Sequence, residues 1–292
     1  MVGGRGVELA AESAVRDAEL FLCLEVDDTR RGGSDALVRR ASAVRLGWFP
    51  EDELSESVEV ELDPRRGRVI AWRRRRFADL VVAEVECPVP EDEAARVLSE
   101  AAAADPAAVL PLDEPEVSGF LARVASLAHW RPGLELPRFD DDFWLQLLPT
   151  LCAGKRSLAE LRRVPLLDFL EGSLTHPQRV ALDREAPERI EVPSGSRLRL
   201  EYEPGSPPVL AVRIQELFGL EATPTVAGGR VPVLLHLLAP NHRPQQVTQD
   251  LASFWRNTYP QVRGELQGRY PKHAWPADPL AAPPERRPRR RS

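Results

Sequence analysis

Proline positions are the feature that most limits what this chain can fold into. A proline inside a helix removes one backbone hydrogen bond and its ring clashes with the preceding turn, so it ends or bends the helix. Prolines interrupt residues 91–170 repeatedly, among them Pro106, Pro111, Pro115, Pro132, Pro137 and Pro149. The helices between them are too short to be stable alone. We therefore expect residues 91–170 to be a helical connector packed between two domains.

Residues 1–90 have the pattern of a small β domain. Segments with the side-chain alternation or composition of strands lie at 20–26, 36–46, 57–62, 68–74 and 80–87. The residues Asp63-Pro64-Arg65-Arg66-Gly67 are typical of a turn between two of these strands, and Pro50 would open one short helix. About five strands round one helix suit a closed barrel of the oligonucleotide/oligosaccharide-binding (OB) kind. We predict such an OB-like barrel, although the helix follows the second strand and normally follows the third.

Residues 171–280 combine helix and strand signals, so the chain as a whole is predicted to be α+β. Thr175 and Gln178 have capping-box spacing at the start of a helix. Strands are expected at 189–192, 197–203, 209–212 and 230–238. A helical apolar face recurs over residues 245–257. We predict an α+β domain with a small, mostly antiparallel sheet, followed by a disordered basic tail at residues 281–292, which carry five arginines and one glutamate.

Composition excludes several classes of protein. The net charge of −6 argues against a protein that coats nucleic acid over its whole surface, so any such contact must be local. The three cysteines, Cys23, Cys87 and Cys152, are far apart and read as reduced thiols, which predicts a cytoplasmic protein. No apolar run approaches the roughly 18 residues that cross a bilayer, so no membrane contact is expected.

The sequence contains no catalytic pattern. A phosphate-binding loop needs G-x-x-x-x-G-K-[ST], but Gly154-Lys155 is followed by Arg156 and has Pro149 where the first glycine belongs. No Asp-Glu-Ala-His motif is present, and the five histidines show no metal-ligand spacing. We therefore predict no catalytic residue, no metal, no cofactor and no ATP hydrolysis by this chain itself.

One basic run stands out in the predicted barrel. It consists of Arg73, Arg74, Arg75 and Arg76. OB-type folds bind single strands through a positive groove with aromatic platforms, and Trp72 and Phe77 flank this run. The alternative is a solvated edge strand whose charges prevent aggregation.

A second motif lies near the C-terminus, at Gly268-Arg269-Tyr270-Pro271-Lys272-His273-Ala274-Trp275-Pro276-Ala277-Asp278-Pro279. This signature resembles the end of the HrpB-type ATP-dependent helicases, bacterial members of the DEAH group of RNA helicases, whose chains finish on RYPKHxWPxDP. Residues 198–220 and 227–240 also follow that family's pattern. The resemblance covers residues 150–280 strongly and residues 4–87 more weakly, and it implies the same OB-like barrel.

The signature itself has two interpretations. Side chains of Arg269, Tyr270, Lys272, His273 and Trp275 could hold phosphates and stack a base. Alternatively, the prolines fix an extended path on which Tyr270 and Trp275 pin the chain to the domain surface, with Asp278 pairing Arg269. Spacing alone does not decide between them.

The leading hypothesis follows from the resemblance. It implies the accessory C-terminal region of an HrpB-type helicase, which binds single-stranded RNA or DNA, or a protein partner, for motor domains supplied in cis or in trans. The alternative is a free-standing protein-interaction module without helicase activity.

Overall fold

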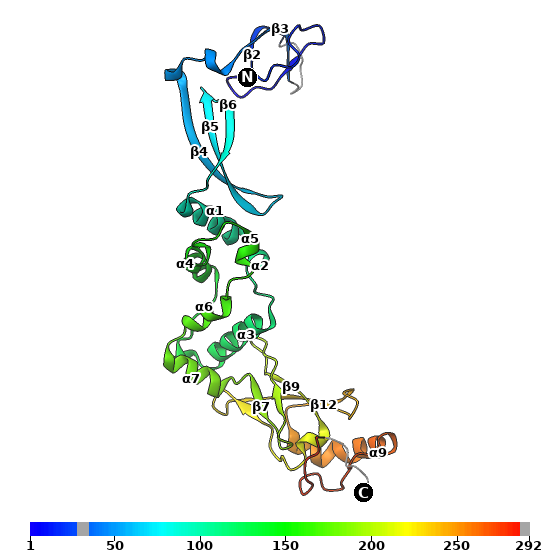
Figure 1. Cartoon of the computed structure of the whole chain (residues 1–292). Helices are drawn as coiled ribbons and strands as arrows, with labels where there is room; N and C mark the ends of the chain where they lie inside the picture. Colours follow the sequence, from blue (N-terminus) through cyan, green and yellow to red (C-terminus); the bar gives the residue numbers. More distant parts are fainter. Residues whose placement is uncertain (28–34, 287–292) are drawn as a thin grey trace. The chain divides into compact units, whose positions relative to one another are not determined.

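The computed structural model describes residues 1–27 and 35–286, which divide into two compact units (Figure 1). Unit 1 comprises Met1–Leu110 and Trp144–Val164, and unit 2 comprises Pro111–Phe143 and Pro165–Ser292. Both units combine helices with small sheets, so the predicted α+β class is confirmed. The helices of residues 91–170 are shared between the two units. The predicted boundaries at residues 90, 170 and 280 stay a prediction.

Unit 1 contains two separate three-stranded sheets. The first has the order β1-β3-β2 and consists of β1 (Val7–Leu9), β2 (Phe21–Asp27) and β3 (Ala36–Ala43). The second is an antiparallel meander of β4 (Leu54–Asp63), β5 (Arg68–Phe77) and β6 (Leu80–Cys87). Between the sheets the chain forms two 3₁₀ turns, η1 (Leu46–Trp48) and η2 (Glu51–Glu53).

The described residues form no closed barrel, so the predicted OB-like barrel is not confirmed. All five predicted strand segments are strands, but β4 pairs only with β5 and β3 pairs only with β1 and β2. The two 3₁₀ turns occupy the segment where the chain would have to continue from one sheet into the other. The short helix expected at Pro50 is one of these turns.

The hairpin between β4 and β5 has the predicted turn. The carboxylate of Asp63 accepts hydrogen bonds from the backbone N–H groups of Arg65 (2.8 Å) and Arg66 (3.2 Å). Gly67 has φ +60°, a left-handed conformation that a residue without Cβ adopts at low cost. These bonds lower the pKa of the Asp63 carboxyl. The turn therefore fixes the register of β5 opposite β4.

Helices complete the core of unit 1. They are α1 (Glu91–Ala104), α2 (Pro106–Val109), α5 (Leu158–Leu161) and the greater part of α4 (Asp141–Cys152). α1 packs against β4 and β5. Leu98 of α1, Leu148 of α4 and Leu161 of α5 are buried, as is Cys152, whose thiol pKa is raised by burial.

Unit 2 begins with helices and ends with a small sheet. The helices are α3 (Pro115–Trp130), α6 (Leu166–Gly172) and α7 (His176–Glu185), and α7 opens on the predicted capping box of Thr175 and Gln178. The strands are β7 (Arg189–Glu191), β8 (Arg197–Arg199), β9 (Val209–Arg213), β10 (Thr225–Val226), β11 (Val231–Pro232), β12 (Leu234–Leu238) and β13 (Pro244–Thr248). β12 runs parallel to β9 and antiparallel to β13, and it lies between them as the central strand.

The last helices start later than the sequence pattern predicts. Residues 244–248 form strand β13 because they pair with β12, so the helix expected from residue 245 is wrong in its first turn. The helical segment starts at α8 (Leu251–Ser253), where the Asp250 carboxylate accepts from the N–H of Ser253 (2.8 Å). A π-helical turn, η5 (Phe254–Thr258), and α9 (Tyr259–Arg269) follow.

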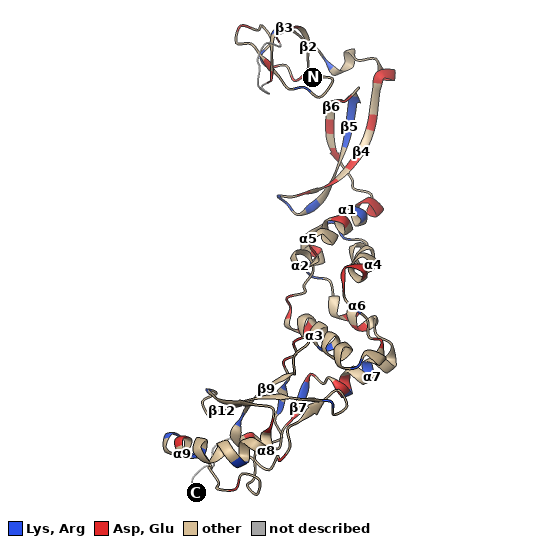
Figure 2. Cartoon of the chain, turned by 180° about the vertical axis from the view of Figure 1, so that it is seen from behind, with Lys and Arg blue, Asp and Glu red and all other residues tan. Residues whose placement is uncertain are grey.

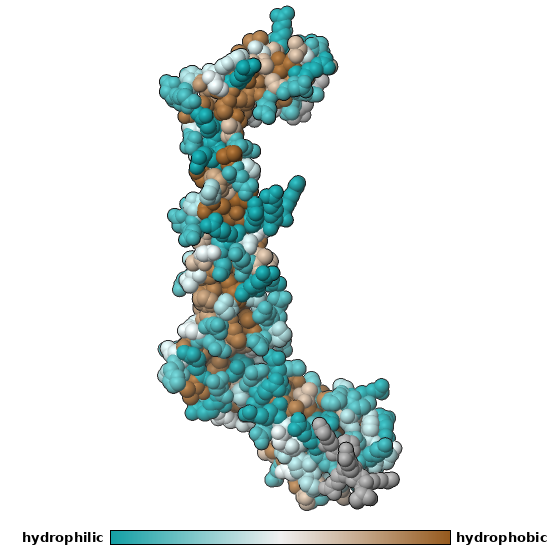
Figure 3. Space-filling model, in the orientation of Figure 1, coloured by the Kyte–Doolittle hydropathy of each residue, from teal (hydrophilic) through white to brown (hydrophobic). Residues whose placement is uncertain are grey.

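Apolar side chains remain on the surface of unit 1 (Figure 3). Leu22, Leu24 and Val26 alternate along β2 and are 56%, 62% and 38% exposed. Register irregularities in the pairing with β3, between Cys23 and Glu25 and between Glu25 and Val26, interrupt the strict two-residue repeat, so these three side chains are grouped by their exposure and are called the apolar strip. Among the described residues, no helix is both long enough and apolar enough to cross a membrane.

Candidate functional site

The arginine run lies on the central strand of the second sheet. β5 is flanked by β4 on one side and β6 on the other, so the predicted alternative of an edge strand is wrong. Opposite Arg74 stand Ser57 of β4 and Glu84 of β6. In Figure 2 the blue strand β5 lies between strands that carry red acidic segments.

Every guanidinium of the run is paired with glutamate. Arg73 Nε lies 3.6 Å from Glu56 Oε1, and Arg75 Nη2 lies 2.6 Å from Glu51 Oε2. The ion-pair partners of Arg74 are Glu59, Glu61 and Glu84. Arg76 pairs with Glu59 and donates to Ser57 Oγ at 2.9 Å. Four arginines thus face five glutamates, which gives the cluster one net negative charge.

Glu59 is the residue that joins the two most enclosed arginines. Its carboxylate accepts hydrogen bonds from Arg76 and Arg74, which lower its pKa to about 2. The same contacts raise the pKa of both arginines. Ionised carboxylates next to a guanidinium reduce its attraction for phosphate. The ion pairs tie the side chains of Arg73 to Arg76 to glutamates within the same unit. Nucleic-acid binding by these four arginines stays a prediction.

The C-terminal signature forms a strap on unit 2. Trp275 is only 7% exposed, and its indole Nε1 donates to the carbonyl of Tyr270 at 3.0 Å. Arg263 Nε donates to the carbonyl of Trp275 at 2.8 Å, and the Tyr259 hydroxyl donates to that of Pro276 at 3.1 Å. The backbone contacts thus hold the chain across α9, as the strap interpretation expects.

The strap continues to residues 215–219, within the segment 198–220 that also follows the family's pattern. The N–H of Gly219 donates to the carbonyl of Pro279 at 3.0 Å, and the N–H of Glu285 donates to that of Gln215 at 2.9 Å. Asp278 accepts from the N–H of Leu280 at 2.9 Å, so the predicted pair with Arg269 is replaced by a local turn.

Residues 281–286 of the predicted tail are therefore described and partly held by these contacts. The remainder of that tail, residues 287–292, lies outside the described residues.

The five candidate residues of the signature do not share one surface role. Trp275 is buried, whereas Tyr270 and His273 are half-buried. The rings of Tyr270 and His273 lie edge to face, with their centroids 6.4 Å apart. Burial lowers the pKa of the His273 imidazole. Arg269 and Lys272 are exposed. Only these two cations are fully presented to solvent, and their binding role stays a prediction.

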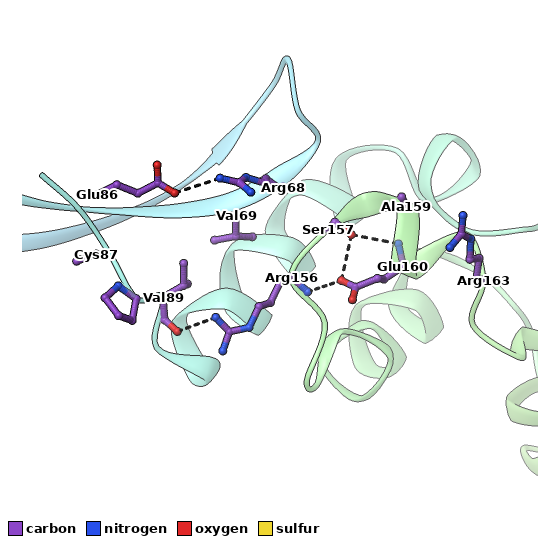
Figure 4. A pocket seen from close by; sticks show the side chains of 11 residues that line it. Arg68, Val69, Glu86, Cys87, Val89, Arg156, Ser157, Ala159, Glu160 and Arg163 are labelled. Carbon is purple, nitrogen blue, oxygen red and sulfur yellow. Dashed lines mark hydrogen bonds and ion pairs between the residues drawn. The ribbon is translucent and has the colours of Figure 1, made fainter.

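A third cluster, which the sequence did not reveal as a site, surrounds a cavity of about 500 Å³ in unit 1 (Figure 4). Three segments bound it: the start of β5, residues 86–89 at the end of β6, and residues 156–163 leading into α5. The N–H of Val69 donates to the carbonyl of Arg156 at 2.8 Å, and the N–H of Leu158 to that of Gly67 at 2.9 Å. Residues 156–158 therefore continue the sheet beside the β4–β5 turn.

A capping box fixes the loop of this cavity. The N–H of Glu160 donates to Ser157 Oγ at 3.3 Å, as its sequence spacing predicts. In return Glu160 Oε2 accepts from the N–H of Arg156 at 2.7 Å and from the Ser157 hydroxyl at 3.0 Å. These bonds lower the pKa of the Glu160 carboxyl, the one from Arg156 most strongly.

The cavity has cations whose donors are not all used. Arg68 pairs with Glu86 at 3.1 Å, and Arg156 Nη1 donates to the carbonyl of Val89 at 3.2 Å. Arg163 makes no side-chain hydrogen bond or ion pair within residues 1–27 and 35–286. Three arginines and two glutamates line the cavity, which leaves one net positive charge. The signal in the sequence was three short basic stretches, at residues 65–68, 155–156 and 162–163, which contain the three arginines of the cavity.

No other chemistry is apparent in the described part of the chain. It contains no group of three or more histidine, cysteine or acidic residues that could hold a metal ion.

Comparison with known proteins shows similarity to the C-terminal region of HrpB-type helicases. Residues 144–279 match the family model described as ATP-dependent helicase C-terminal, HrpB_C. The ATP-dependent RNA helicase HrpB of Escherichia coli (strain K12) is 36% identical over 280 residues, which are 94% of this chain and 33% of that protein. The chain thus spans about a third of the length of that curated relative.

Two solved structures are similar as well. One is the crystal structure of E. coli DExH-box NTPase HrpB, with a TM-score of 0.67 and 34% identity over 97% of this chain and 36% of that one. The other is the crystal structure of Escherichia coli DEAH/RHA helicase HrpB, with a TM-score of 0.58 and 32% identity over 92% of this chain and 34% of that one.

The strap interpretation predicts that Trp275→Ala destabilises unit 2. Truncation of a buried aromatic side chain costs about 3–5 kcal/mol, and here a hydrogen bond is lost as well. Hydrogen exchange of the β12 amides should report a correspondingly lower free energy of opening. Lys272→Ala, three residues away and exposed, is the control and should stay within about 0.5 kcal/mol of the unmodified chain. Equal effects of the two substitutions would contradict the strap.

The ion pairs of Glu59 predict a contribution to acid sensitivity. Its folded pKa of about 2 is below the ordinary 4.5, so the stabilisation is complete above about pH 4.5 and is lost as the pH falls towards 2. Thermal unfolding between these pH values should show a smaller pH dependence for Glu59→Gln than for the unmodified chain. Glu56→Gln, on the same strand, is the control. An unchanged pH dependence in Glu59→Gln would refute the assignment.

Proposed function

This chain belongs to the HrpB family of ATP-dependent helicases, whose C-terminal region it matches, and we propose that it binds single-stranded nucleic acid for the helicase motor. The observation that carries the proposal is the 36% identity to an ATP-dependent RNA helicase over 94% of this chain. A region that accompanies a motor, and itself has no phosphate-binding loop, contributes by holding the substrate or the motor.

Local positive charge supports the nucleic-acid part of this proposal. The overall charge is −6, so phosphate contacts need sites where cations are not matched by carboxylates. The described residues offer such cations at the unit 1 cavity and at Arg269 and Lys272 of the signature. An OB-like mode of binding remains part of the proposal, with two small open sheets in place of a closed barrel.

The apolar strip on β2 supports contact with protein. Leu22, Leu24 and Val26 are exposed together, and exposed apolar patches of this kind often mark interaction surfaces. We propose that this strip contacts the motor domains. We also propose that the protein is cytoplasmic. The same strip favours the second candidate function, a free-standing protein-interaction module.

RNA binding should be measured by fluorescence anisotropy with a short, labelled single-stranded RNA across a salt series. Each phosphate contact releases counterions, so affinity should fall steeply between about 50 and 200 mM salt. No binding at the lowest salt would refute the nucleic-acid function and leave the interaction module.

Binding of a purified HrpB-type motor fragment tests the protein contact. Leu24→Glu places a charge in the apolar strip and should weaken the complex about tenfold or more in a titration. Val247→Glu is the control, because Val247 is 49% exposed on β13 of unit 2. If the two variants bind the motor equally well, the strip is not the contact surface.

A further inference from the structure

We propose that the unit 1 cavity between β5, β6 and α5 is a binding site for a phosphodiester group of a single-stranded nucleic acid. The inference rests on the proposed nucleic-acid function and assigns its contact to Arg156 and Arg163, with Arg68 at the edge. These residues belong to none of the motifs that the sequence marked as binding sites.

The backbone around the cavity is held in place before any ligand arrives. Residues 156–158 are bonded to the β4–β5 turn through Val69 and Gly67, at 2.8 Å and 2.9 Å. The capping box of Ser157 and Glu160 fixes the following turn. A site on a rigid backbone loses little conformational entropy when it binds, so even one or two ionic contacts can contribute to affinity.

The two glutamates that line the cavity leave some of its guanidinium donors unpaired. Glu160 directs its carboxylate to the Arg156 N–H and the Ser157 hydroxyl instead of to a guanidinium. Glu86 is paired with Arg68 at the edge. Arg163 has no partner within the described residues, and Arg156 uses one of its five donors on the carbonyl of Val89. Both guanidinium groups can therefore donate to phosphate oxygens.

The arginine run on β5 is the natural comparison within the same unit. Its four guanidinium groups face five glutamates, and a phosphate would have to displace existing ion pairs. At the cavity no such exchange is needed for Arg163. This difference in ion pairing favours the cavity over the β5 run as the phosphate-binding site, although arginines are denser in the sequence of the run.

The lining also indicates which part of the strand binds. The cavity of about 500 Å³ is lined by no aromatic residue, so no ring is available there to stack a base. Apolar side chains of Val69, Val89 and Ala159 lie beside the cations and suit contact with a ribose. Binding should consequently depend on the backbone of the strand and little on its base sequence.

The test compares three double variants of the whole chain in the RNA titration. Arg156→Gln with Arg163→Gln should weaken binding about tenfold at low salt and reduce the salt slope by about 1 to 2. Arg40→Gln with Arg96→Gln removes the same charge from exposed ion pairs elsewhere in unit 1 and is the matched control. Its binding should change less than about twofold.

The third variant, Arg73→Gln with Arg75→Gln, asks whether the run on β5 is the true site. A large loss there together with unchanged binding in the cavity variant would overturn the proposal. Circular dichroism checks the fold of each variant. Arg163→Lys keeps the charge at a position without side-chain bonds, so it should fold normally and retain most of the affinity that Arg163→Gln loses.

The source of the phosphate is tested with three further probes. Oligo(U), oligo(A) and single-stranded DNA of equal length should all bind less tightly to the cavity variant, and inorganic phosphate should compete weakly. Tight binding of inorganic phosphate without any effect on RNA would overturn the assignment to a nucleic acid. If the unmodified chain binds RNA and the cavity variant binds it equally well, the cavity is not the site and the proposed function stands. If the unmodified chain binds no RNA, both fail.

Discussion

The backbone pairing between the β4–β5 turn and residues 156–158 is the interaction on which unit 1 depends. It joins segments 87 and 91 positions apart through two hydrogen bonds, Val69 to Arg156 and Leu158 to Gly67. The pairing brings α5 to the end of the sheet, creates the wall of the cavity and sets the orientation of Arg156 and Arg163. At Val69 the strand β5 is paired with β4 along one edge, and its pairing with β6 begins only at Ala71. The pairing with residues 156–158 therefore satisfies backbone groups on the other edge that would otherwise remain open to water or to another strand.

Ion pairing decides where positive charge is available in this molecule. Arginine supplies almost all of the basic residues, and the same residue type is used in two ways. Within the β4–β5–β6 sheet it bonds glutamates across the strands, whereas beside α5 it keeps free donors. Density of basic residues in a sequence is therefore a poor guide to positive surface, because the neighbouring strand can carry matching carboxylates.

Local signals in the sequence were sufficient for the elements whose bonds are local. The turn at residues 63–67 and the capping boxes at Ser157 and Thr175 involve residues within four positions, and the structure has all three. Features that need distant partners were not predictable in this way. The expected barrel does not close because the two sheets of unit 1 do not pair with each other. The first turn of the helix expected from residue 245 is a strand because it pairs with β12. The ion-pair partners of the β5 arginines follow from strand register only in part. Glu84 stands opposite Arg74 and pairs with it, but Glu56 stands opposite Arg75 and pairs with Arg73, while Arg75 pairs with Glu51.

Unit 1 is not continuous in sequence, and this has a consequence during synthesis. Residues 1–110 are translated before Leu148, Leu151 and Leu161, which complete their core and follow only after residues 111–143 of unit 2. The apolar surface of the two sheets of unit 1 therefore stays incompletely covered until about fifty further residues have been translated. This takes a few seconds at ordinary elongation rates. A nascent chain in that state is a substrate for chaperones, and a stop codon placed between the two segments of unit 1 would leave its interior unfinished.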